Sequence, residues 1–314
     1  MKSSTVLPVL VTSRAGEFNY FRRWWEDGHR FGLMTVPHKK VRQNSKCNPA
    51  KAGRGPVVSA NLAALHADFP GPRYLDNGIF ARIGMTTREL LAYAEGVACN
   101  YLFAPDVFAD PVATLERAEE TMCEWKRSRY PFRLVGVAQG RPVEHWGIEA
   151  PDEALARSVD DYVACVRELV GLGYEHIAVG GLLRRRGDSE KSRQVGAGPL
   201  RRIDEPLMWG VLGKLRELEA EDGLALPPWL HVLGALNQDR LSRFTRLGVT
   251  SSDSKQWARA YTRYRDFKGS SAAYRRKLRE RFVLENYFQQ QMPLPGLYLA
   301  RVPLREKRIV AGND

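Results

Sequence analysis

The chain has 314 residues and a formal net charge of +12, from 48 Lys and Arg against 36 Asp and Glu. Its 44% hydrophobic and 27% charged residues are typical of a globular protein, which excludes a disordered chain and a small disulfide-linked scaffold. The four cysteines are widely spaced, so we expect a reducing compartment and no structural zinc. Because the apolar runs are short and broken by Gly, Pro or charge, we expect no membrane span and a cytoplasmic protein.

Short apolar runs alternate with segments of helical periodicity along the chain. The runs that predict β-strands are 7–13, 31–36, 74–80, 100–106, 133–139, 176–181, 230–235 and 249–253. Helices are expected over 16–28, 58–68, 152–170, 206–220 and 237–247. Two more follow clear start signals: Thr86 and Glu89 have the spacing of a capping box, and Asp110-Pro111 supplies an N-cap and a first helical residue.

Strands that are each followed by a helix predict an α/β fold, a (β/α)8 TIM-type barrel. We assign residues 1–265 to this barrel and residues 266–314 to a basic helical C-terminal extension packed on it. The turn-rich, basic segment 38–55 is expected to be an insertion after the second strand. A doubly wound parallel sheet is the competing architecture.

Polar residues and glycines stand where the predicted strands end. In a barrel the chemistry sits at the C-terminal ends of the strands, so these residues are expected at one rim. A carboxylate at an apolar strand end is costly to desolvate unless it is paired or takes part in chemistry, which makes a candidate functional site. For any single Asp, capping the next helix or pairing with Arg is an equally good explanation. The residues are Asp76, Asp106, Gln139, Gly180, Gly181 and Asp253.

Several other chemistries lack their motifs in this sequence. It contains no G-x-x-x-x-G-K-[ST] and no G-x-G-x-x-G after a strand, so no cofactor is predicted. The six histidines are scattered singly, and we interpret each as a surface or core residue rather than a ligand. Gly180-Gly181 alone is compatible with a phosphate site, which leaves open an enzyme acting on a small phosphorylated metabolite.

Two segments carry much of the positive charge. Segment 184–202 is rich in Arg, Lys and Gly and predicts a long basic loop, and segment 259–281 interleaves basic residues with aromatic ones. Basic residues mixed with aromatics suit a phosphate backbone and unstacked bases. A solvated helix face with its aromatics in the core explains either segment alone, but the two together favour a nucleic-acid partner.

Five short motifs, in order, resemble those of the tRNA-guanine transglycosylase superfamily, nearest to its DNA-modifying branch, which inserts 7-deazaguanines. They are D-N-G-I-F at 76–80, A-P-D at 104–106, V-A-Q-G at 137–140, V-G-G-L at 179–182 and S-S-D-S-K-Q-W at 251–257. The resemblance implies exchange of guanine for a free 7-deazaguanine base of the preQ0 type, through a covalent intermediate between Asp and C1′.

The resemblance also implies roles for individual residues. Asp253 takes the position of the nucleophile, and Asp76 that of the general acid and base. Phe80 would stack on the base, with Asn77 in place of the family's serine. Base contacts would come from Asp106, Gln139, Gly180 and Gly181, and contacts to the nucleic-acid backbone from Arg184, Arg185, Arg186, Lys255 and Arg259.

The sequence departs from the tRNA enzymes in one way that bears on the partner. Their zinc site follows the nucleophile, whereas no cysteine follows Cys165 here, so no metal is expected. We therefore favour DNA over tRNA as the substrate. A barrel that binds nucleic acid without catalysis, and a requirement for an accessory protein, both remain open.

Overall fold

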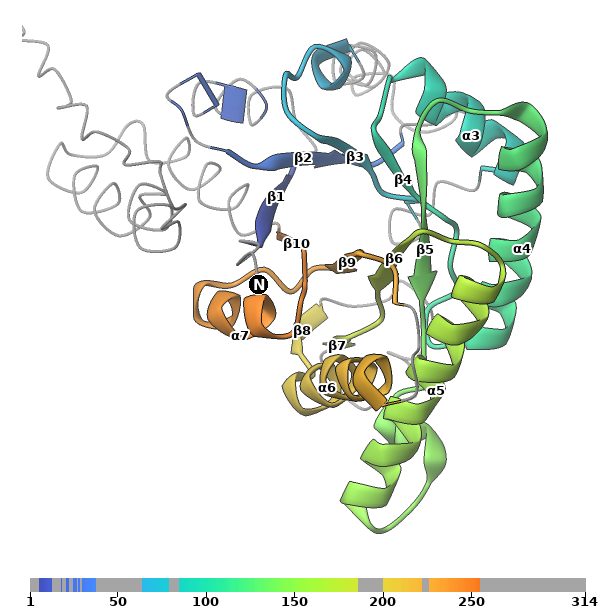
Figure 1. Ribbon diagram of the computed structural model, residues 1–314, viewed down its shortest axis with the longest axis vertical. Coiled ribbons are helices and arrows are strands. Elements are labelled where there is room, and N and C mark those ends of the chain that lie inside the picture. Colours follow the sequence, from blue (N-terminus) through green and yellow to red (C-terminus); the bar gives the residue numbers. More distant parts are fainter. Residues whose placement is uncertain are drawn as a thin grey trace, which may run out of the picture.

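The computed structural model describes residues 6–12, 18, 21–22, 25–26, 28, 30–37, 64–78, 85–185, 200–221 and 226–254. Eight parallel strands close into a barrel in the order β1-β10-β9-β6-β5-β4-β3-β2 (Figure 1). The chain therefore has the expected TIM-barrel fold, and each expected strand overlaps an observed one. The strands are β1 (Leu7–Val11), β2 (Gly32–Thr35), β3 (Arg73–Leu75), β4 (Tyr101–Phe103), β5 (Arg133–Ala138), β6 (His176–Val179), β9 (Trp229–Val232) and β10 (Ser251–Ser254).

Helices surround the barrel and follow its strands (Figure 1). They are α3 (Thr87–Gly96), α4 (Pro111–Ser128), α5 (Pro151–Gly171), α6 (Glu205–Glu221) and α7 (Leu241–Arg246), with the short 3-10 turns η3 (Val143–Trp146) and η5 (Gln238–Arg240). Both start signals are confirmed. The Glu89 amide donates to Thr86 Oγ1 over 3.2 Å while the Glu89 carboxylate accepts from the Thr86 amide, and Asp110 caps α4 by accepting from the Ala113 amide.

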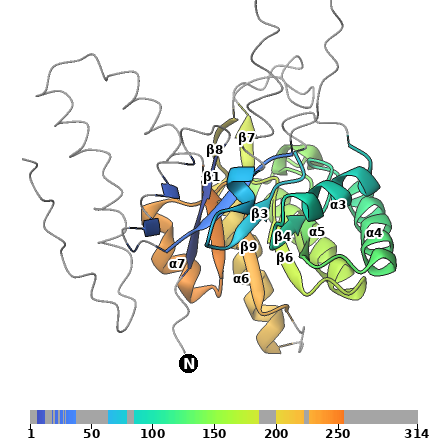
Figure 2. The same cartoon turned by 90° about the horizontal axis from the view of Figure 1, so that it is seen from above.

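The prediction of one long loop over 184–202 is wrong at both of its ends. Residues Leu183–Arg185 form β7 and Leu200–Ile203 form β8, and the two strands pair antiparallel (Figure 2). The register pairs Leu183 with Ile203, and both residues are apolar, whereas the charge and glycine of the segment had indicated only a loop. The hairpin leaves the barrel directly after Gly181 and Leu182, at the rim where the candidate residues gather.

Three buried apolar clusters hold the barrel together, and two of them bear on the site. One lies between the strands and helices, where Val166, Leu169 and Val211 are fully buried. The other lies inside the barrel and is unusually aromatic. The ring of Tyr74 from β3 stacks at 6.3 Å on that of Trp229 from β9, although these two strands are not paired, so the contact crosses the barrel interior. The rings fix how far the strands stand apart.

Several expectations fall outside the described residues. They concern the insertion 38–55, Phe80, Arg186, Lys255, Arg259 and the C-terminal extension 266–314. For the same reason the domain boundary at 265 stays a prediction. Among the helices of the described ranges, none combines the length and the apolar character that crossing a membrane requires.

Substitution of Gly32 tests how closely the barrel interior is packed. A Cβ added there would lie 2.3 Å from the Tyr74 ring, so we expect Gly32→Ala to destabilise the fold by about 1–3 kcal/mol through overpacking. As a control, Gly213→Ala in α6 meets nothing within 4 Å and should stabilise the protein by up to about 1 kcal/mol. Urea unfolding of the three proteins measures both effects, and a neutral Gly32→Ala would contradict the packing argument.

Candidate active site

The residues singled out at strand ends do lie at one rim. Asp76 follows β3 directly, Gln139 follows β5 and Gly180 follows β6. Asp106 lies in the loop after β4, and Asp253 lies within β10. Because all eight strands run parallel in a closed barrel, these positions share its C-terminal end.

A buried carboxylate joins three of the loops at this rim. Asp106 is 3% exposed, and Asn77 Nδ2 donates to its Oδ1 over 2.6 Å. Gln139 Nε2 donates to the other carboxylate oxygen. Asn77 Nδ2 also donates to the Ala104 carbonyl over 2.8 Å. Two amide side chains from neighbouring loops therefore fix the plane of the Asp106 carboxylate, and we call Asn77, Asp106 and Gln139 the amide-carboxylate cluster.

Burial raises the pKa of Asp106, and the hydrogen bonds from Asn77 and Gln139 oppose that rise. Both donors belong to neutral amides, and the charge of Arg117, whose guanidinium donates to the Asp106 main-chain carbonyl over 3.5 Å, also opposes the rise. A carboxylate in such a setting keeps acceptor capacity for a ligand that brings N–H donors of its own.

The glycine pair allows the backbone to approach this cluster. Gly181 has φ +70°, and a Cβ there would lie 2.1 Å from Gln139 Oε1 and 2.7 Å from the Tyr162 hydroxyl. The Tyr162 hydroxyl donates to the Gly180 carbonyl over 2.9 Å. Glycine is thus required at position 181 both by its backbone angle and by the space that Gln139 occupies.

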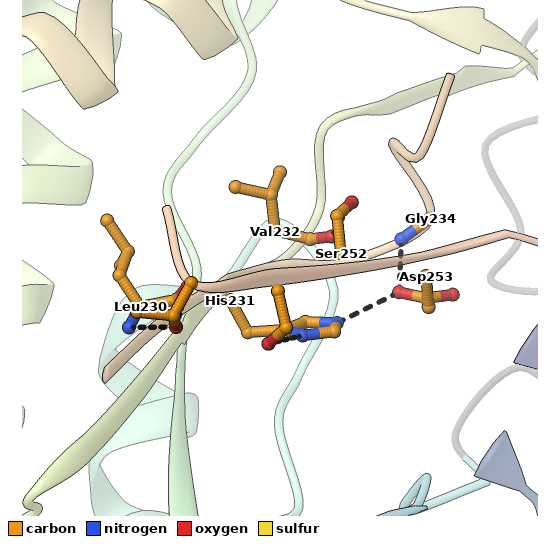
Figure 3. A network of polar contacts seen from close by, with 8 residues as sticks. Leu230, His231, Val232, Gly234, Ser252 and Asp253 are labelled. Atoms are coloured by element: carbon orange, nitrogen blue, oxygen red, sulfur yellow. Dashed lines mark hydrogen bonds and ion pairs between the residues drawn. The ribbon is translucent and has the colours of Figure 1, made fainter. Parts of the chain in front are cut away.

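Asp253 belongs to a second polar group, on the adjacent strands β9 and β10 (Figure 3). Its Oδ1 accepts from the Gly234 amide over 2.6 Å and lies 3.1 Å from His231 Nε2. His231 Nδ1 lies 2.8 Å from Ser251 Oγ. Among the described residues, no hydrogen bond reaches Asp253 Oδ2.

His231 is the site residue that the sequence analysis missed, since single histidines were assigned to the core or the surface. Its side chain is indeed fully buried, but it contacts Asp253. Strands β9 and β10 pair with His231 opposite Ser251, and this register brings the His231 ring to Asp253. No local sequence signal sets the register.

The remaining predicted site residues are placed as follows. Asp76 Oδ1 accepts from the Gly78 amide over 3.2 Å, so the side chain also shapes its own loop. Arg184 and Arg185 lie in β7, and their side chains are not among the described ones. In the described part of the chain, no three His, Cys, Asp or Glu side chains gather as a metal site would require.

Comparisons with known proteins bear on the fold alone. No protein-family model and no curated protein matches the chain. The solved structure of the YdjI aldolase from Escherichia coli K12 is similar at 10% identity and a TM-score of 0.47, over 92% of this chain and 91% of that one. A similarity of this size carries no argument about activity, and the barrel assignment depends on the strand pairing itself.

Gly181 and Gly147 form a matched pair of test positions. Both have positive φ, but a Cβ on Gly147 meets nothing within 4 Å. Gly147→Ala should therefore cost only the backbone strain, about 1–2 kcal/mol, whereas Gly181→Ala should cost more because it also displaces Gln139. Chemical denaturation measures the difference, and equal losses would show that the Gln139 contact is unimportant.

Asp106 should leave a signature in the pH dependence of stability. Because burial raises its pKa above the ordinary 3.8, the folded chain binds the proton more tightly than the unfolded chain does. Stability contributed by the protonated carboxyl is therefore lost as the pH rises above about 4. We expect the free energy of unfolding of Asp106→Asn, relative to the native chain, to increase over that range in urea titrations. Asp239→Asn, at an exposed residue of η5, is the control, and a difference independent of pH would contradict the expectation.

Proposed function

We propose that this chain is a guanine transglycosylase that exchanges guanine in DNA for a 7-deazaguanine base. The observation that carries the proposal is that the amide-carboxylate cluster and the Asp253 carboxylate both lie at the C-terminal end of one closed barrel. The first has the chemistry of a guanine-binding site and the second that of a nucleophile. The motif resemblance to the transglycosylase superfamily supports the same assignment.

The amide-carboxylate cluster suits the edge of a guanine or 7-deazaguanine. That edge presents two N–H donors, N1–H and the 2-amino group, beside the O6 acceptor. An ionised carboxylate accepts about four hydrogen bonds, and Asn77 and Gln139 supply one each, so Asp106 has capacity for both base donors. The Ala104 carbonyl takes the second amide hydrogen of Asn77, whereas the second hydrogen of Gln139 Nε2 is suited to O6.

Asp253 suits attack on an anomeric carbon. In the proposed first step, an oxygen of Asp253 bonds to C1′ while the bond from C1′ to the base nitrogen breaks and its electron pair leaves with guanine. In the second step the 7-deazaguanine nitrogen bonds to C1′ and the carboxylate leaves. Two displacements on one carbon retain its configuration, as in retaining glycosidases.

Proton transfer is assigned to Asp76, at the end of β3. It would donate a proton to the departing guanine and take one back from the incoming base, so the cycle balances. The Gly78 amide bonds its Oδ1 and holds the carboxyl in place for this role.

The positive charge of the β7–β8 hairpin supports the proposal of a polyanionic substrate. Its register places Arg184 opposite Arg202, directly beyond the rim. Like charges on facing positions of a strand pair are destabilising by themselves, and a phosphate between them removes that cost. Together with the net charge of +12, this favours a nucleic acid over a small phosphorylated metabolite. A duplex base must leave its stack to reach the rim, as in other base-modifying enzymes.

The test measures incorporation of a radiolabelled 7-deazaguanine base into duplex DNA, with tRNA in a parallel reaction. We expect label in DNA with the full-length chain and none with Asp253→Asn, which keeps acceptor geometry for Gly234 but removes the nucleophile. Glu124→Gln, in α4 beside Arg127, is the control and should keep full activity.

Each other outcome is informative. Label in tRNA alone would replace DNA by tRNA as the substrate. Incorporation by Asp253→Asn at the native rate would remove Asp253 as the nucleophile. If neither polymer is labelled although both bind, the barrel binds nucleic acid without this chemistry. Repeating the assay with a lysate of the source cells tests whether an accessory protein is needed.

A further inference from the structure

We propose that His231 is the positioning residue of Asp253: its Nε2–H holds Oδ1, so that Oδ2 is the oxygen that attacks. The inference rests on the proposed function, because it assigns how the nucleophile of that reaction is oriented. It starts from the contacts of a buried histidine that no motif in the sequence accounts for.

The packing of the barrel fixes the plane of the His231 ring. The imidazole is fully buried and stacks on Trp229 at 5.6 Å with an angle of 13° between the rings. Phe103 from β4 lies 5.1 Å away across the barrel interior, and Tyr74 from β3 lies 6.3 Å away. A ring confined in this way keeps each nitrogen pointing at one partner (Figure 3).

The chemistry of the partners fixes where the hydrogen sits. An ionised carboxylate only accepts hydrogen bonds, so His231 Nε2, at 3.1 Å from Asp253 Oδ1, must be the donor. In the neutral ring Nδ1 then accepts, and Ser251 Oγ, at 2.8 Å, donates to it. Ser251 and His231 therefore both donate in one direction, toward Asp253.

The consequence is an asymmetric carboxylate. Oδ1 receives two N–H donors, from His231 and from the Gly234 amide, whereas Oδ2 receives none among the described residues. When Oδ2 bonds to C1′, Oδ1 becomes the carbonyl oxygen of the ester and keeps both donors. When the ester breaks, the same donors stabilise the returning negative charge. No proton leaves His231 in either step.

The first experiment detects the hydrogen on the His231 ring by NMR and does not require an active enzyme. The full-length chain is labelled with 15N-histidine, and the His231 signals are assigned by their loss in His231→Gln. We expect a neutral ring with its hydrogen on Nε2, exchanging slowly with water. In Asp253→Ala this exchange should become faster, because the acceptor is gone. A His231 whose Nε2 carries no hydrogen overturns the proposal whatever the enzyme does.

The second experiment compares base-exchange kinetics of two substitutions at the same position. His231→Phe keeps a flat ring but lacks the donor, so we expect kcat to fall about 10- to 100-fold, the range for losing a hydrogen bond to a charged group, with KM for the base unchanged. His231→Gln places a donor at a similar reach and should recover most of the rate. Equal losses in both variants, with cooperative thermal unfolding retained, would overturn the role of the N–H.

Two neighbouring serines supply a matched control. Ser251 donates to His231, whereas Ser252 donates to the Val232 carbonyl over 2.7 Å on the other face of β10, and both are buried. Ser251→Ala should lower kcat and shift the Nδ1 resonance, and Ser252→Ala should do neither. If wild-type chain exchanges no base, the proposed function fails, and the 15N spectrum still decides the His231 assignment.

Discussion

The closure of the barrel between its first and last strands is the constraint on which the site depends. β1 pairs with β10 in parallel, with Val9 opposite Asp253, and this contact joins the two ends of the described chain. Closure makes the C-terminal ends of all eight strands one ring, so residues far apart in sequence become neighbours. Without it, Asp253 would stand at a sheet edge, away from the loops that hold Asp76 and Asp106.

The two buried carboxylates at the rim are stabilised in different ways. Asp106 is held by two neutral amides, which satisfy part of its acceptor capacity and leave the rest for a ligand. Asp253 is held by the N–H of Gly234 and the ring of His231, both on one oxygen. The first arrangement leaves acceptor capacity on a buried carboxylate, and the second concentrates both described donors on one oxygen of the other carboxylate.

The aromatic interior connects fold and site. Tyr74, Trp229 and Phe103 pack around His231 inside the barrel, so the groups that keep the strands apart also fix the ring that contacts Asp253. The contacts that pack the barrel interior are therefore also the contacts that position the His231 ring. The hairpin β7–β8 adds charge at this end of the barrel without altering its closure, because it is inserted between β6 and α6.

The sequence by itself determined the eight strands, the capped starts of α3 and α4, and the polar residues at the strand ends, since apolar periodicity and capping depend on near neighbours. It did not reveal the hairpin strands around Arg184 and Arg202, where charge and glycine obscured the pattern. Nor did it reveal the partnership of His231, Ser251 and Asp253, or the hydrogen bonds by which Asn77 and Gln139 hold Asp106, although it grouped these last three residues at one rim. Only the tertiary structure decided these, because strand register and barrel closure bring together side chains that no local pattern relates.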